Sequence, residues 1–203
     1  MPLFPLPNVV LFPQAVLPLH IFEERYKLMT ADALEGRRQI AMALLRPGWE
    51  KNYHVMPEIE PVVCVGTILS HERLADGRYN FLLRGDSRAQ IVREASGHPY
   101  RLAKLQPLNE EAVDELDLVS ERRRLSMAFQ DPRLRCTGIG RRFREMLGGS
   151  ISTAIISDLV AFNFLDNVPL KQSLLADGDL RRRVGRVVEA FEALYSHLQP
   201  NLN

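Results

Sequence analysis

The sequence predicts an α+β protein, with mostly antiparallel strands in its first half and a helical bundle in its second. Short apolar runs closed by Pro and Gly fill residues 1–108, and Asp76-Gly77 is a strong signal for a turn between two strands. From residue 109 onward, apolar residues recur at helical spacing instead. The sequence therefore predicts two domains, a β domain at 1–108 and a helical domain at 109–203.

The first 29 residues are predicted to be extended, although they are strongly apolar. Proline fixes φ, donates no backbone hydrogen bond and biases the preceding residue toward extended structure. Five prolines interrupt this segment: Pro2, Pro5, Pro7, Pro13 and Pro18. At Phe22 the prolines stop and a helix is predicted, with Gly36 as a plausible C-terminal cap. This is the one helix expected among the strands.

The rest of the first half predicts short strands whose spacing suits an antiparallel barrel or sandwich. Gly85-Asp86 is expected to interrupt the strand that follows the Asp76-Gly77 turn. The predicted strands are 39–45, 62–70, 78–83, 88–92 and 99–105.

The second half predicts several helices. A long helical segment after residue 109 ends at Pro132, and a mostly apolar helix spans 151–162. A short helix through residue 175 starts with Asn167 as cap and Pro169 at its first position. The final helix, 180–198, has apolar residues at i, i+4, i+7 and i+8, and Asp177 or Asp179 can cap it.

Composition excludes several classes of protein. The chain has 203 residues, 46% of them apolar, and a net charge of +1, so no global field favours nucleic acid or an anionic membrane. Its two cysteines, Cys64 and Cys136, exclude a disulfide framework and a four-thiolate zinc site. A signal peptide begins with positively charged residues, but no Lys or Arg precedes Arg25 here. Prolines also interrupt the long apolar stretch at the start of the chain. We expect a cytoplasmic protein with no membrane partner.

The opening residues carry a recognisable motif, Phe4-Pro5-Leu6, then Val10-Leu11-Phe12-Pro13, then Leu17-Pro18-Leu19-His20-Ile21-Phe22-Glu23 and Arg25-Tyr26. It resembles the start of the N-terminal substrate-recognition domain of Lon proteases, which also occurs as a stand-alone protein, except that Gln14 replaces the usual glycine. The motif positions carried over are Pro5, Leu6, Phe12, Pro13, Pro18, Leu19, His20, Phe22, Glu23, Arg25 and Tyr26.

A second motif is similar to the same family and lies in the predicted strands. Its positions are Gly66, Asp76, Gly77, Arg78, Gly85 and Arg88, with Ala89 where a phenylalanine is more usual. The resemblance covers nearly the whole chain and is loose over 131–150. It implies a PUA-like β-barrel followed by a C-terminal α-helical bundle. We interpret the motif residues as structural, with Phe22 and Tyr26 on one helix face against the barrel; ligand contact is the alternative.

The chemistry of a complete Lon protease is not predicted. No Gly-Lys pair exists, so a phosphate-binding G-x-x-x-x-G-K loop is excluded. Thr137 and the glycines after it suit a loop that opens a helix. Lys171 and Ser173 are the only concrete hydrolase candidates, but their spacing points them to different helix faces. The histidines lack metal-ligand spacing. We therefore predict no catalytic residue, no metal and no cofactor, and a peptidase label would be transferred from full-length Lon.

The loop at 47–57 is the candidate binding site. Trp49, Tyr53 and Met56 are side chains suited to adaptable contact with a peptide. The resemblance implies unfolded or extended polypeptide as the partner, and a role in protein quality control that needs no ATP. In the other interpretation, Trp49 folds back to cover one end of the barrel.

Nucleic-acid binding by the barrel and the arginine-rich segment 122–144 is the alternative function. Carboxylates precede that segment directly, so intramolecular neutralisation is the simpler explanation of its charge. The sequence predicts neither a particular client nor an oligomeric state. The arginines concerned are Arg122, Arg123, Arg124, Arg133, Arg135, Arg141, Arg142 and Arg144.

Overall fold

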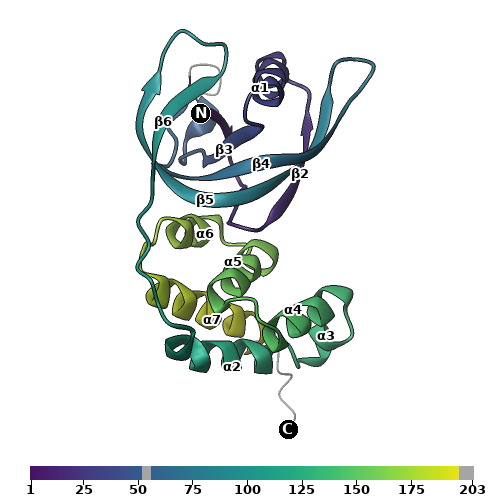
Figure 1. The fold of residues 1–203 in the computed structure, drawn as a ribbon, viewed down its shortest axis with the longest axis vertical. Coiled ribbons are helices and arrows are strands. Elements are labelled where there is room, and N and C mark those ends of the chain that lie inside the picture. The colour runs from purple at the N-terminus through teal and green to yellow at the C-terminus, as the bar shows by residue number, and fades with distance from the viewer. Residues whose placement is uncertain (52–55, 197–203) are drawn as a thin grey trace. The chain divides into compact units, whose positions relative to one another are not determined.

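The computed structural model describes residues 1–51 and 56–196 (Figure 1). It confirms the α+β class. The chain forms two compact units, which we call the sheet unit (Met1–Leu108 and Val168–Ala176) and the helical unit (Asn109–Asn167 and the chain from Asp177). The sheet unit thus takes back a short segment from late in the sequence. The division into two domains at residue 108 stays a prediction.

The described part of the sheet unit contains one six-stranded sheet, with the strand order β2-β5-β4-β3-β1-β6. Among the strand pairs of the described residues, only β1 with β3 is parallel. The long β5 pairs with β2 and β4 along its first part and with β6 along its last part, so the sheet coils back on itself. The strands are β1 (Pro2–Leu6), β2 (Val16–Ile21), β3 (Gln39–Leu44), β4 (Val62–Arg73), β5 (Tyr79–Ala95) and β6 (Arg101–Pro107).

The six-stranded sheet does not form the barrel that the family resemblance implies. Strand β2 lies at an edge, and β1 meets β6 through only two residue pairs within the described chain. Pro18 sits inside β2, yet its pairing with β5 is unbroken. Because proline has no N–H to give to the ladder, its nitrogen must face the free edge.

The predicted break in β5 at Gly85-Asp86 is wrong, because a β-bulge absorbs it. Val65 pairs with Ser87 and Gly66 with Gly85, which leaves Asp86 as the extra residue. A Cβ on Gly85 would lie 2.2 Å from the carbonyl oxygen of Phe12. Glycine is needed here because the chain before β2 passes directly over β5.

Helix α1 (Glu24–Glu35) lies between β2 and β3 in the chain and buries Tyr26, whose ring packs edge-on against Phe4 at 4.7 Å. The predicted shared helix face of Phe22 and Tyr26 is wrong. Glu23 is the N-cap, so Phe22 precedes the helix, and it is 63% exposed.

Helix α6 (Val168–Leu175) belongs to the sheet unit and is tied to it by two side chains. The Gln172 amide donates to the carbonyl oxygen of Val62 at 2.9 Å. Arg88, 5% exposed, donates from Nε to the carbonyl oxygen of Leu175 at 3.2 Å. A cation at the C-terminal end of a helix is attracted to the negative end of the helix dipole, which stabilises the contact. The motif residue Arg88 therefore anchors α6 to β5.

The helical unit surrounds a cluster of four phenylalanines. Phe129, Phe143, Phe164 and Phe191 pack with ring centroids 4.8–5.5 Å apart. Asp179 caps α7 by accepting from the Arg182 amide at 3.0 Å. The elements are η2 (Glu115–Leu118), α2 (Val119–Ala128), α3 (Pro132–Arg135), α4 (Gly138–Gly148), α5 (Thr153–Phe164) and α7 (Leu180–Ser196).

Buried charge also holds the helical unit together. Arg183, on α7, is 1% exposed and donates to the carbonyl oxygen of Asp177 at 2.7 Å. It also pairs with Glu110 at 3.1 Å and with Asp158 at 3.5 Å. Among residues 1–51 and 56–196, no helix combines the length and apolar composition needed to cross a bilayer.

Candidate functional site

The structure places the predicted site residues at different parts of one loop. Trp49 is half-buried, whereas Met56 is 52% exposed. Tyr53 lies outside the described residues. Met56 has φ +66°, in the left-handed region that side chains other than glycine rarely adopt. Trp49 and Met56 line different hollows of the sheet unit, so the described chain does not bring them together.

Trp49 is a shared wall between two open hollows. The α1 hollow has a volume of about 460 Å³ and the α6 hollow about 420 Å³, and both include Pro7 and Trp49. Each volume falls in the range of ordinary ligand pockets. This geometry differs from a tryptophan that simply covers one end of a barrel.

Aromatic side chains of the opening motif line the α1 hollow, together with Pro5 of β1 and Pro7 after it. The exposed Phe22 ring stacks on His20 with centroids 6.2 Å apart. Arg25 pairs with Glu23 at 2.9 Å and lies over the Tyr26 ring at 4.6 Å. The Glu23 carboxylate that lines this hollow is thus paired, and the open surface is largely apolar.

The α6 hollow combines apolar walls from β3, β4 and α6, including Leu44, Val62 and Val168. Its polar side chains already have partners: Glu60 pairs with Arg46 at 3.5 Å, and Gln172 is bonded to β4. Such a surface offers mainly apolar contact.

The structure gives no evidence for Ser173 as a hydrolase nucleophile or for a metal site among the described residues. The Ser173 hydroxyl donates to the Leu170 carbonyl oxygen of its own helix at 2.8 Å. Within the part of the chain that the structure describes, no group of three or more His, Cys, Asp or Glu residues is arranged to hold a metal ion.

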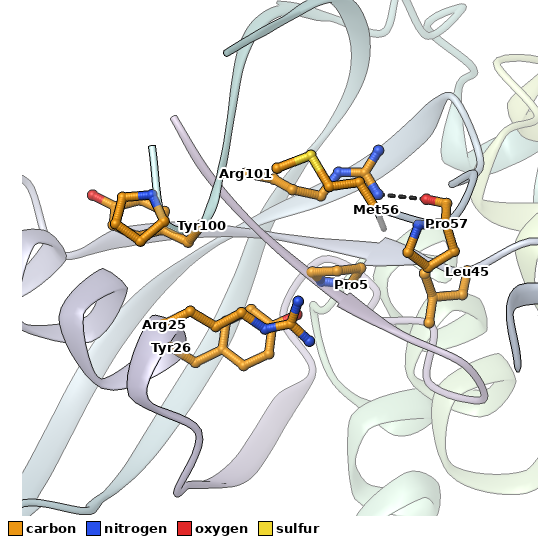
Figure 2. A pocket seen from close by; sticks show the side chains of 9 residues that line it. Pro5, Arg25, Tyr26, Leu45, Met56, Pro57, Tyr100 and Arg101 are labelled. Carbon is orange, nitrogen blue, oxygen red and sulfur yellow. Dashed lines mark hydrogen bonds between the residues drawn. The ribbon is translucent and has the colours of Figure 1, made fainter. Parts of the chain in front are cut away.

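Met56 lines a third and much smaller space, the Met56 hollow, of about 20 Å³ (Figure 2). That is room for about one water molecule. Its walls include Tyr100, whose hydroxyl donates to Asp32 at 2.5 Å. Burial, followed by this hydrogen bond, raises the pKa of Tyr100 to about 12.

The three hollows share lining residues with one another. The Met56 hollow shares Pro5 and Tyr26 with the α1 hollow, the α1 hollow shares Pro7 and Trp49 with the α6 hollow, and the α6 hollow shares Leu45 with the Met56 hollow. We call this set of hollows the β1 groove. All of its lining residues belong to the sheet unit.

The sequence predicted Trp49 as a candidate site residue but did not indicate most of the residues that line the hollows beside it. Pro7, Val168 and Pro169 line hollows, although the sequence indicated only extended chain and a helix start at those positions. Phe22 was interpreted as structural, yet its ring is exposed on a hollow wall. The available signal was its place directly before the acidic start of a helix, where a side chain need not follow the buried helix face.

The arginine-rich segment has extensive internal bonding. Arg122 donates to the carbonyl oxygens of Met146, Leu147, Gly149 and Ile151, at and beyond the end of α4. Neutralisation by the preceding carboxylates explains only part of this, because most partners are carbonyl oxygens or later residues. Arg124 pairs with Glu192, Arg133 with Asp131, and Arg144 with carbonyls of Phe129 and Arg135.

Comparisons with known proteins agree on one family. Residues 1–192 match the family described as the ATP-dependent protease La (LON) substrate-binding domain. The Lon protease of Dictyoglomus thermophilum is 25% identical over 191 residues, which cover 92% of this chain and 23% of that protein. Lon protease 2 of Desulfotalea psychrophila is 27% identical over 203 residues, 98% of this chain and 25% of that protein. The chain thus spans about a quarter of the length of these relatives.

Solved structures support the same fold. The N-terminal domain of Lon protease from the Mycobacterium avium complex matches with a TM-score of 0.74 at 17% identity, covering 97% of this chain and 98% of that one. A Lon N-terminal domain protein from Xanthomonas campestris matches with a TM-score of 0.69 at 22% identity, covering 93% and 96%. This chain therefore belongs to the family of the Lon substrate-binding domain.

Proposed function

We propose that this chain is a non-catalytic module that binds unfolded or extended polypeptide along the β1 groove. In this proposal it acts in cytoplasmic protein quality control without ATP. The name protease belongs to relatives about four times its length, and the match lies on their substrate-binding domain.

The observation that carries the proposal is the position of Trp49 between two apolar hollows. Binding energy in protein interfaces concentrates in a few aromatic anchors that contact fully desolvated partners. An extended peptide laid along β1 could place alternate side chains in the two hollows, on either side of the indole ring. Paired charges on the groove walls would not oppose this burial.

The test uses a fluorescently labelled peptide that alternates Phe with Ser, with binding followed by anisotropy. Trp49→Ala is expected to weaken binding at least about tenfold, as the loss of an aromatic anchor does. Met127→Ala is the matched control, because Met127 is 65% exposed and belongs to the helical unit, whereas the residues that line the groove belong to the sheet unit. Equal affinity of Trp49→Ala and the parent chain would reject the site.

The salt dependence of binding distinguishes peptide binding from the alternative function, nucleic-acid binding. Apolar burial survives raised ionic strength, whereas contacts to phosphates weaken steeply with salt. Arg123, Arg135, Arg141 and Arg142 are exposed and support the nucleic-acid alternative. Salt-sensitive binding of a single-stranded oligonucleotide that is lost in Arg141→Ala/Arg142→Ala, without any peptide binding, would favour it.

A further inference from the structure

Phe22 is an exposed aromatic residue on the wall of the α1 hollow. It precedes α1 and is 63% exposed, so its ring is not part of the core. It lines the same hollow as Trp49. The helix does not depend on this ring for its packing, because Tyr26 buries its own ring against Phe4. The Phe22 ring is therefore placed where a ligand in the hollow would contact it.

The Phe22 ring stacks on an imidazole that is itself held in place. The two rings of Phe22 and His20 lie at 29° with centroids 6.2 Å apart. Arginine has no acceptor atom, so Nη1 of Arg78 donates to Nε2 of His20, at 3.3 Å. Nδ1 of the same imidazole donates to Oδ1 of Asn80 at 2.6 Å. Bonds at both ring nitrogens fix the plane of the imidazole, and the stacked Phe22 ring is held nearly parallel to it.

Arg78 is fixed in turn by the turn that precedes β5. The Asp76 carboxylate accepts from the Arg78 amide at 3.1 Å and from its Nε at 2.6 Å. Gly77 has φ +81°, a conformation that glycine adopts without strain. Arg78 is not among the residues that line the three hollows, whereas His20 lines the α1 hollow. Arg78 therefore acts on the groove through His20.

We propose that Phe22 is a second aromatic anchor of the β1 groove, and that Arg78 is a positioning residue that holds Phe22 in place through His20. Trp49 and Phe22 line one hollow, so both can contact the same apolar side chain of a bound polypeptide. Binding energy concentrates in such aromatic side chains, and a ring that is ordered beforehand loses less freedom on binding. This inference rests on the proposed function, because it assigns these residues roles at the same site.

The first experiment measures affinity for the peptide that alternates Phe with Ser. Phe22→Ala is expected to weaken binding about tenfold, as the loss of an aromatic anchor does. Leu28→Ala is the matched control, because Leu28 is 44% exposed on α1 and is not among the residues that line the hollows. If Trp49→Ala weakens binding and Phe22→Ala does not, the anchor role of Phe22 is overturned and the proposed function stands.

The second experiment tests the positioning role by fluorine NMR on a chain labelled with para-fluorophenylalanine. The Phe22 signal is identified by its loss in Phe22→Leu, and its chemical shift reports the stacked imidazole. Arg78→Met is expected to move this signal toward that of the free amino acid and to weaken peptide binding about threefold. Arg93→Met, at an exposed arginine of β5, is the matched control and should change neither.

The positioning role requires both changes in Arg78→Met, and the absence of either would overturn it. If the parent chain does not bind the peptide, the proposed function and the anchor role of Phe22 both fail. The fluorine signal then still decides whether Arg78 orders the Phe22 ring. Both substituted side chains are exposed, so both variants are expected to keep the melting temperature of the parent chain.

Discussion

The sheet unit and the helical unit satisfy their backbone groups in different ways. In the sheet unit, carbonyl oxygens and amides pair across strands, and the close crossing at Gly85 uses no side chain. In the helical unit, short helices end against one another, and arginines such as Arg122 reach the free carbonyls. The sheet unit uses such bonds as well, from Arg88 and Gln172, but relies mainly on strand pairing, and the β1 groove lies in that unit.

The largest expected effect tests the role of buried charge in the helical unit. Arg183→Met removes the bond to the Asp177 carbonyl and leaves Asp158, which is 3% exposed, without this cation. Breaking a buried pair in this way costs about 3–5 kcal/mol. Urea denaturation measures the loss in free energy of unfolding, and Arg183→Met/Asp158→Leu is expected to recover part of it. A loss no greater than for Arg181→Met, at an exposed pair with Asp117, would contradict this account.

The next effect tests the close backbone crossing in the sheet unit. Gly85→Ala adds a Cβ at 2.2 Å from the Phe12 carbonyl oxygen, so one of two paired segments must shift. We expect a loss of about 2–3 kcal/mol, typical of overpacking. Gly138→Ala is the matched control, because its Cβ would meet nothing within 4 Å. Similar melting temperatures for the two variants would show that the sheet unit tolerates movement of this crossing.

The smallest effect depends on pH and concerns the start of α7. Hydrogen bonding from Arg182 is the main cause that lowers the pKa of Asp177 in the folded chain. A carboxyl whose folded pKa is depressed stabilises the fold above its unfolded pKa, near 4, and loses that contribution as pH falls through the folded value. Asp177→Asn should therefore cost at most about 1 kcal/mol at neutral pH, since Arg182 is largely exposed.

Urea denaturation at neutral and acidic pH checks this prediction. The difference between the parent chain and Asp177→Asn should shrink as pH falls below about 4. A difference that stays constant over that range would mean that packing at Asp177, rather than its charge, stabilises the start of α7.

The sequence predicted elements whose signals are local. The prolines predicted the extended start of the chain. The spacing of apolar residues predicted α7, and the aspartates before it predicted its cap. The continuity of β5 could not be predicted, since the bulge at Gly85 depends on a crossing chain more than 70 residues earlier. Helix α3 has four residues and no periodicity to detect. The hollows were equally inaccessible, because Pro7, Trp49 and Val168 meet only in the folded sheet unit.

Helix α6 has a consequence for how the chain matures during synthesis. Residues 1–108 leave the ribosome long before residues 168–176, yet the carbonyl that Arg88 binds and the amide that Val62 accepts belong to that late segment. Until α6 emerges, Arg88 lacks its bond to the Leu175 carbonyl oxygen, and the α6 hollow lacks the wall that α6 provides. A nascent chain should therefore gain its complete groove only after residues 168–176 have been synthesised.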